Sequence, residues 1–137
     1  MPLHLVDSDR EVAGALQAAF ASYPEVPVTE GDILAVARVC VVSPANSYGF
    51  MDGGIDAQYT AFFGLGPQTE LQERIARRPD GELPVGSSIV VRTGHQRIPY
   101  MICAPTMITP GPVPKHNAFY AMAAVLNAIA HHRAQQR

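Results

Sequence analysis

Residues 35–63 read AVARVCVVSPANSYGFMDGGIDAQYTAFF, and this stretch carries most of the information about the fold. It begins with a valine-rich apolar run, Ala35 to Val42, interrupted only by Arg38. Such a run is typical of a strand that is covered on both faces. A polar, glycine-rich loop follows from Ser43 to Gly54, and Ile55 to Phe63 is then predicted to form a helix. A strand, a loop and a helix in this order are the repeating unit of a layered α/β domain.

Strands and helices alternate on both sides of this stretch. Short apolar segments predict strands at 3–7, 26–29, 88–93 and 100–104, and helices are predicted at 9–20, 67–78 and 116–132. The first helix is expected to begin with a capping box, in which Ser8 is the N-cap and Glu11 reaches back to it. The elements together predict an α/β fold with three α/β/α layers around a mostly parallel mixed sheet.

The last predicted helix is apolar on nearly all sides. One face carries Phe119, Met122, Leu126 and Ile129, and the other carries mainly alanine and Tyr120. A helix of this kind is either buried deeply or used for self-association. This helix is therefore the candidate contact of a homo-oligomer.

Composition limits the class of protein. The chain has 137 residues, which predicts one domain spanning residues 1–137. Ten Lys and Arg against twelve Asp and Glu give a net charge of −2, which disfavours nucleic-acid binding because that requires a basic stripe. The longest apolar run, Ala118 to Ala130, is shorter than the ~20 residues that span a bilayer. The N-terminus lacks a secretory signal, so we expect a cytoplasmic protein without a membrane partner.

Polar residues that can bind a sugar nucleotide follow the predicted strands. Ligands in such sheets bind beyond the carboxyl ends of the strands, where Asp32 and Asn46 are expected. Gly53 and Gly54 precede a helix, so their N–H groups can face an anion without a Cβ in the way. Asp56 lies in the first turn of that helix and can act as a base. This set of residues can accommodate a nucleotide diphosphate sugar.

The order of these motifs resembles the macro domain family, which comprises ADP-ribose-binding domains and ADP-ribosyl hydrolases. The resemblance covers residues 30–106. Gly31-Asp32-Ile33 is similar to the family's G-D-I segment, Ser43-Pro44-Ala45-Asn46 to its N-A-A-N segment, and Gly53-Gly54-Ile55-Asp56 to its G-G-V-D segment. Thr93-Gly94 and the strand from Tyr100 follow in the family's order.

The resemblance implies a role for each matching residue. Asp32 would bind the adenine amine beside the Ile33 backbone, and Asn46 would orient the distal ribose. Asp56 would position or activate water against the anomeric carbon, or steer the substrate's own groups to do so. Asn46 and Asp56 are therefore the implied catalytic residues. The other implied ligand-binding residues are Ser43, Ala45, Gly53, Gly54, Ile55, Pro105 and Thr106. The implied partner is ADP-ribose or an ADP-ribosylated substrate, and hydrolysis of an ADP-ribosyl ester or glycosidic bond is possible.

The chain departs from the family pattern at three places. Ser43 stands where the family has the first asparagine of N-A-A-N. Met51 and Asp52 replace small glycines and are expected to add bulk and negative charge near the phosphates. The chain ends after its last helix, whereas the family continues with a strand and a second glycine-rich phosphate loop. We therefore expect a domain that is C-terminally incomplete relative to the family.

These departures support a second hypothesis of another class. The chain would be a non-enzymatic interaction or structural module that keeps the fold with a degenerate pocket. We expect no metal site, because the five histidines form no i,i+4 pair and no cysteine stands at ligand spacing. We also expect no cofactor. Ser43 and Ser47 lack the G-x-S-x-G frame of an acyl-enzyme nucleophile.

Overall fold

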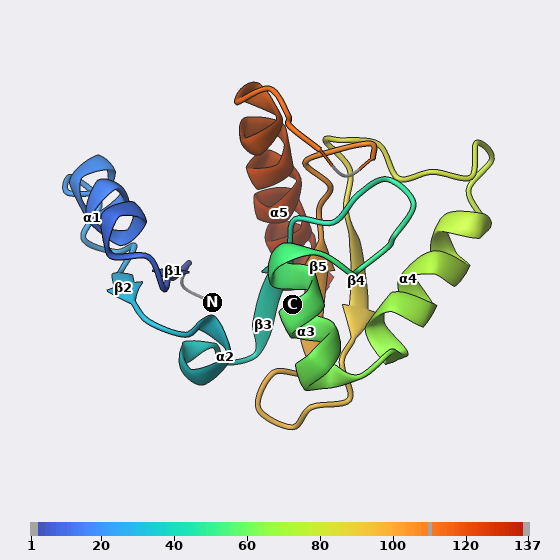
Figure 1. The fold of residues 1–137 in the computed structure, drawn as a ribbon, viewed down its shortest axis with the longest axis horizontal. Coiled ribbons are helices and arrows are strands. Elements are labelled where there is room, and N and C mark those ends of the chain that lie inside the picture. Colours follow the sequence, from blue (N-terminus) through green and yellow to red (C-terminus); the bar gives the residue numbers. More distant parts are fainter. Residues whose placement is uncertain (1–2, 110, 136–137) are drawn as a thin grey trace. The chain divides into compact units, whose positions relative to one another are not determined.

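The computed structural model describes residues 3–109 and 111–135, and these form two compact units. The first unit is Met1–Arg38 and the second is Val39–Arg137. Figure 1 shows the elements of both units, each of which is described here by itself. The prediction of one domain over residues 1–137 stays a prediction.

Over its described residues, 3–38, the first unit contains two parallel strands and two helices. Strand β1 (Leu5–Asp7) pairs with β2 (Val28–Glu30), so that Leu5 lies opposite Val28. Helix α1 (Arg10–Ala19) connects the two strands, as parallel pairing requires. Its N-cap is Asp9, whose Oδ1 accepts hydrogen bonds from the N–H groups of Glu11 at 2.8 Å and Val12 at 3.3 Å. The prediction of Ser8 as the N-cap is therefore wrong by one residue.

The predicted strand from Ala35 to Val42 is wrong in its first half. Residues Ile33–Val36 form helix α2, because the Asp32 side chain caps it by accepting from the Leu34 N–H at 2.9 Å. Val39 then takes a positive φ of 71°, an unusual conformation for a β-branched residue, which separates α2 from the next strand. That strand, β3, comprises only Cys40–Ser43.

The second unit is built on a three-stranded mixed sheet in the order β3-β5-β4. Strand β5 (Tyr100–Cys103) runs parallel to β3, with Ser43 opposite Cys103, and antiparallel to β4 (Ile89–Arg92). Two of the three strand pairings in the described chain are thus parallel. This agrees with the predicted mixed, mostly parallel α/β class.

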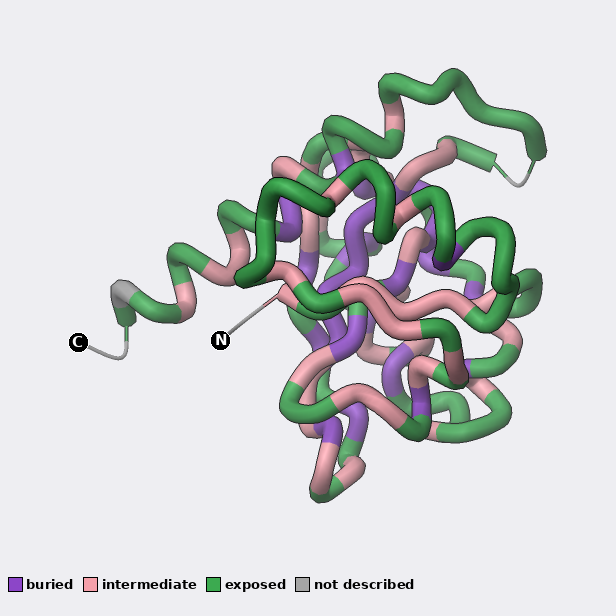
Figure 2. Tube along the Cα trace, turned by 90° about the vertical axis from the view of Figure 1, so that its left-hand side faces the viewer, coloured by how far each residue is buried: buried purple, intermediate pink, exposed green. Residues whose placement is uncertain are grey.

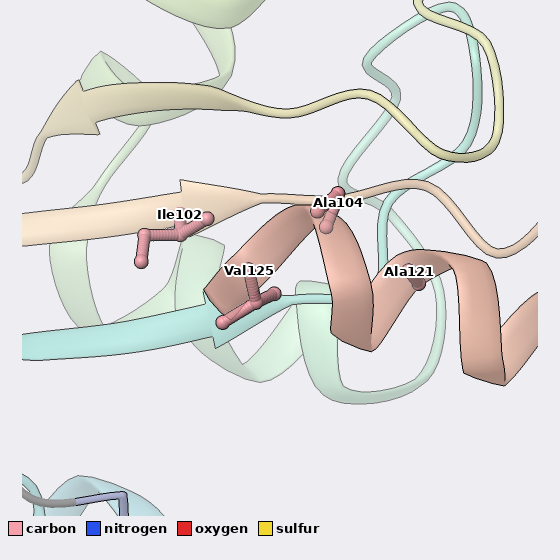
Figure 3. Packing of buried hydrophobic residues seen from close by; sticks show 5 residues of the cluster. Ile102, Ala104, Ala121 and Val125 are labelled. Atoms are coloured by element: carbon pink, nitrogen blue, oxygen red, sulfur yellow. The ribbon is translucent and has the colours of Figure 1, made fainter. Parts of the chain in front are cut away.

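Helices lie on both faces of this sheet, which gives the second unit three layers (Figures 1 and 3). Helices α3 (Gly54–Phe63) and α4 (Gly66–Ala76) lie on one face, and α5 (His116–Gln135) lies on the other. Figure 3 shows Ala121 and Val125 of α5 turned toward Ile102 and Ala104. These residues form a buried cluster with Ala124. Full burial of a valine side chain stabilises a fold by about 1.5–3 kcal/mol, so this cluster fixes α5 on the sheet.

Helix α5 is buried along one narrow stripe only. Buried positions recur between exposed ones along the helix (Figure 2). Phe119 is 72% exposed and Leu126 is 48% exposed, whereas Ala121, Ala124 and Val125 are buried. The small alanines let the helix approach the sheet closely, and the larger apolar side chains remain outside. Of the two alternatives for this helix, the structure does not show deep burial, and self-association stays a prediction.

Candidate functional site

The loop between β3 and α3 is organised around the side chain of Asn46. Asn46 is only 4% exposed. Its Nδ2 donates to the Phe50 carbonyl at 2.9 Å, and its Oδ1 accepts from the N–H groups of Tyr48 at 3.1 Å and Phe50 at 3.2 Å. All three bonds are local, so the amide of Asn46 fixes the shape of the loop.

The same loop is joined to the segment that follows β5. Asn46 forms a parallel bridge with Met107, and the Ser47 N–H donates to the Met107 carbonyl at 3.0 Å. Both the N–H and the Oγ1 of Thr106 donate to the Pro44 carbonyl at 3.1 Å. The structure thus brings Ala45, Asn46, Pro105 and Thr106 to the same end of the sheet, beyond the carboxyl ends of two parallel strands.

Gly49 lets the loop pack closely against α4. Its φ is +77°, and a Cβ at this position would lie 3.0 Å from Cδ1 of Ile75 and 3.2 Å from Cγ of Leu71. Both requirements, a positive φ and no side chain, are met by glycine alone. The contact anchors the middle of the loop on the helix.

Met51 points into the protein interior. It is 1% exposed, its N–H donates to Oε1 of Gln68 at 2.7 Å, and its carbonyl accepts from Oγ1 of Thr60 at 2.7 Å. The expectation that Met51 adds bulk near the phosphates is therefore wrong, because an apolar side chain of this size is more stable in the core. Asp52 is exposed.

Asp56 and Ser43 form a buried hydrogen-bonded pair. Ser43 ends β3 and is fully buried, and Asp56 lies in the first turn of α3 and is 7% exposed. Oγ of Ser43 donates to Oδ1 of Asp56 at 2.6 Å. Burial raises the pKa of the Asp56 carboxyl, the Ser43 hydrogen bond lowers it, and the Asp52 charge raises it, with a net upward shift. A carboxyl of this kind is suited to acid–base chemistry.

The N-terminus of α3 presents backbone groups without a side-chain cap. Gly53 is the N-cap, with extended backbone, and no side chain forms a capping hydrogen bond. Gly53 and Gly54 are exposed, and a Cβ on either would meet no atom within 4 Å. The first N–H groups of the helix, including that of Ile55, can therefore bind an anion from outside.

Asp32 and Ile33 belong to the first unit. The Asp32 carboxylate caps α2 and is exposed, and Ile33 is the first residue of that helix. The structure therefore gives Asp32 a local role that the sequence pattern had not indicated. The predicted contact of Asp32 with an adenine amine stays a prediction.

Two general features of the described residues bear on function. Among residues 3–109 and 111–135, no group of three or more His, Cys, Asp or Glu side chains could hold a metal ion. Of the helices in that part of the chain, none combines the length and the apolar character that crossing a membrane requires.

The sequence matches the model of the Macro domain over residues 42–136. This match includes both Asn46 and Asp56, extends over α5, and does not include Asp32 or Ile33. Macro domains generally bind ADP-ribose.

Two curated relatives are uncharacterized proteins of Aquifex aeolicus and Aeropyrum pernix. The chain is 33% identical to a protein of Aquifex aeolicus over 86 residues, which are 63% of this chain and 48% of the relative. It is 35% identical to a protein of Aeropyrum pernix over 100 residues, which are 72% of this chain and 50% of the relative. The chain thus spans about half the length of the curated relatives that it matches.

A solved structure has a similar fold. It is the macrodomain of Mycobacterium tuberculosis DarG, with a TM-score of 0.65 and 22% sequence identity, and the match covers 77% of this chain and 68% of that one. At this identity the likeness establishes the fold, and the predicted macro-like α/β fold is confirmed.

Proposed function

The chain belongs to the macro domain family, and from this premise we propose that it binds ADP-ribose or a related nucleotide diphosphate sugar at the loop between β3 and α3. The observation that carries the proposal is the uncapped N-terminus of α3 at Gly53 and Gly54, within the matched residues. Backbone N–H groups and the helix dipole favour the negative charge of a diphosphate at this place.

The residues around this helix start would complete the site. Asn46 would orient the distal ribose through the loop that its amide holds in shape. Ala45, Pro105 and Thr106 would line the sugar side, because Thr106 is bonded to the backbone of Pro44 beside them. Ile55 would contribute its N–H to the phosphates.

Substitution of Gly53 tests this proposal without damaging the helix. Asp and Asn are both good N-cap residues, and there is space for either side chain. G53D places a negative charge where the diphosphate would bind, so we expect it to weaken ADP-ribose binding at least about tenfold more than G53N does. Calorimetric titration measures both affinities. The absence of heat with wild-type protein at millimolar ADP-ribose, or equal affinities of the two variants, would contradict the proposal.

We further propose that Asp56 supports hydrolysis of an ADP-ribosyl bond. Its buried carboxylate would take a proton from water as the water oxygen bonds to the anomeric carbon. The bond between the anomeric carbon and the modified group breaks in the same step, and the Asp56 carboxyl then returns the proton that it took from water to the leaving group. D56N keeps the size of the side chain, so we expect it to lose release of ADP-ribose from an ADP-ribosylated peptide while it keeps most of the affinity. Equal loss of affinity and turnover would indicate a binding role only.

Adenine recognition by Asp32 requires a separate experiment. D32A should weaken adenosine monophosphate more than ribose 5-phosphate, because only the former carries the amine that the carboxylate would bind. Circular dichroism must accompany the titrations, because Asp32 also caps α2. An equal effect on the two ligands would contradict the adenine contact.

A second candidate function is a non-enzymatic interaction module. The exposed large side chains of α5 favour it, since Phe119, Tyr120, Met122 and Leu126 are 38–72% exposed. Through this face the chain would form a homo-oligomer, whose mass light scattering would measure. A monomer that binds ADP-ribose would contradict this candidate and support the first.

A further inference from the structure

The hydroxyl of Ser43 forms two hydrogen bonds in the protein interior. Its Oγ accepts a hydrogen bond from the Ala45 N–H at 3.2 Å and donates to Oδ1 of Asp56 at 2.6 Å. A hydroxyl has one hydrogen to donate, so that hydrogen is committed to Asp56. Because Ser43 is fully buried, its hydroxyl is directed at Asp56 and at the loop rather than at an external ligand.

The two oxygens of the Asp56 carboxylate are in different environments. In the described part of the chain, Ser43 is the only hydrogen-bond partner of the Asp56 side chain, and it occupies Oδ1. Over the same residues, no buried side-chain oxygen lacks a hydrogen-bond partner. Oδ2 therefore reaches the solvent side, in agreement with the 7% exposure of the residue. One oxygen is held and the other is accessible.

We propose that Ser43 is a positioning residue for Asp56: its hydroxyl holds Oδ1 and thereby fixes the direction in which Oδ2 meets water. The part of this proposal that concerns turnover rests on the proposed hydrolysis. A carboxylate on the first turn of a helix can adopt several rotamers, and the bond to the end of β3 selects one of them. The same bond stabilises the charged form, against burial and against the charge of Asp52.

Titration of Asp56 tests the proposal, because a purely structural role of Ser43 would leave the pKa of Asp56 unchanged. Carboxyl carbons are labelled with ¹³C in aspartate, and the signal of Asp56 is identified by its loss in D56N. In S43A the midpoint of the Asp56 titration should move to higher pH, because the hydrogen-bond donor that stabilises the charged carboxylate is lost. S43T keeps the hydroxyl and should restore the wild-type midpoint.

A matched control is available in the same loop. Ser47 is 1% exposed, and its Oγ donates to the Met107 carbonyl at 3.4 Å, so S47A also removes a buried hydroxyl. S47A should leave the midpoint of Asp56 at its wild-type value. If S43A leaves that midpoint unchanged, or if S47A moves it as far as S43A does, the proposal is overturned.

Wild-type protein provides a measurement that does not depend on the folding of any variant. The Ser43 hydroxyl proton should exchange slowly with water and give a resolved proton signal, which changes as pH falls through the midpoint of Asp56. A signal that is insensitive to this titration, or fast exchange at every pH, would overturn the proposal.

The turnover measurement separates this proposal from the proposed function. With an ADP-ribosylated peptide as substrate, S43A should lower kcat by roughly 10- to 100-fold, with a smaller effect on KM, and should move the acidic limb of the pH profile upward. A shifted Asp56 midpoint without any turnover in wild type refutes hydrolysis and leaves the Ser43–Asp56 pair intact. Turnover whose pH profile is the same in wild type and S43A refutes the positioning role and leaves hydrolysis intact.

Discussion

Replacing Gly49 by alanine tests how closely the β3–α3 loop packs on α4. A φ of +77° costs an alanine roughly 1–2 kcal/mol. The added Cβ would lie 3.0 Å from Cδ1 of Ile75, 3.2 Å from Cγ of Leu71 and 3.3 Å from Cγ of Gln72. Crowding of this kind in a packed interior costs about 1–3 kcal/mol. The two effects together lower the free energy of unfolding by about 2–5 kcal/mol.

Gly81 separates the two contributions. Its φ is +68°, and a Cβ there would meet no atom within 4 Å, so G81A carries the conformational cost without the crowding. At about 4 °C per kcal/mol for a chain of this size, G49A should lower Tm by ~8–20 °C and G81A by ~4–8 °C. Calorimetry measures both Tm values, and urea unfolding gives the free energies. A loss in G49A no larger than that in G81A would refute the described contact between loop and helix.

Three other substitutions test single interactions. D56N should stabilise the protein at neutral pH, because the folded state raises the pKa of Asp56. Relative to the variant, wild type is then most stable below the unfolded-state pKa of about 3.9. It loses this stability as the pH rises through the folded-state pKa. Urea unfolding of both proteins from pH 4 to 8 checks this, and a difference that is constant with pH contradicts it. Y59F removes the 3.0 Å hydrogen bond from the phenolic hydroxyl to the Val42 carbonyl and should cost about 1 kcal/mol in urea unfolding, whereas no loss would mean that water replaces the hydroxyl. D9A removes the N-cap of α1 and should cost about 1 kcal/mol, seen as faster amide hydrogen exchange in α1, and unchanged exchange would mean that the cap contributes nothing.

Elements with strong local signals could be predicted from the sequence. Helix α3 begins at Gly54, one residue before its predicted start, and Pro67 marks the first turn of α4. The segment before β3 could not be assigned in this way, because Ile33–Val36 is apolar enough for either a helix or a strand. The Asp32 cap decides in favour of the helix. From the sequence alone, Asp32 could equally be a helix N-cap or the residue that follows a strand.

The inner surface of α5 illustrates a second limit. In a helix where apolar residues surround the axis, periodicity does not identify the buried stripe, and the large side chains are an unreliable guide. The structure buries Ala121, Ala124 and Val125 because their small size suits close approach to the sheet, and Phe119 stays outside. Which residues of the helix are buried depends on the shape of the opposing sheet, and the sequence of the helix alone does not reveal that shape.

Two local features of the helix start at the candidate site could be predicted from the sequence, but the hydrogen bonds around it could not. Glycines before a helix and a carboxylate in its first turn are local features, and both are found as expected at Gly53 and Asp56. The hydrogen bond between Ser43 and Asp56 joins residues that are 13 positions apart in the chain, and no spacing rule predicts it. Likewise, the amide of Asn46 binds its own loop, which depends on how residues 46–50 turn.

The ties between separate segments determine how the β3–α3 loop could be transferred to another scaffold. Pro44 and Asn46 are bonded to residues 106 and 107, and the Thr106 carbonyl accepts from Nδ2 of Asn117 in the first turn of α5 at 2.9 Å. A graft of the loop alone would leave these partners behind and lose its conformation. Protein engineers who borrow this loop would therefore need to transplant the segment after β5 and the opening turn of α5 with it, as well as the residues of α3 and α4 that bond to Met51.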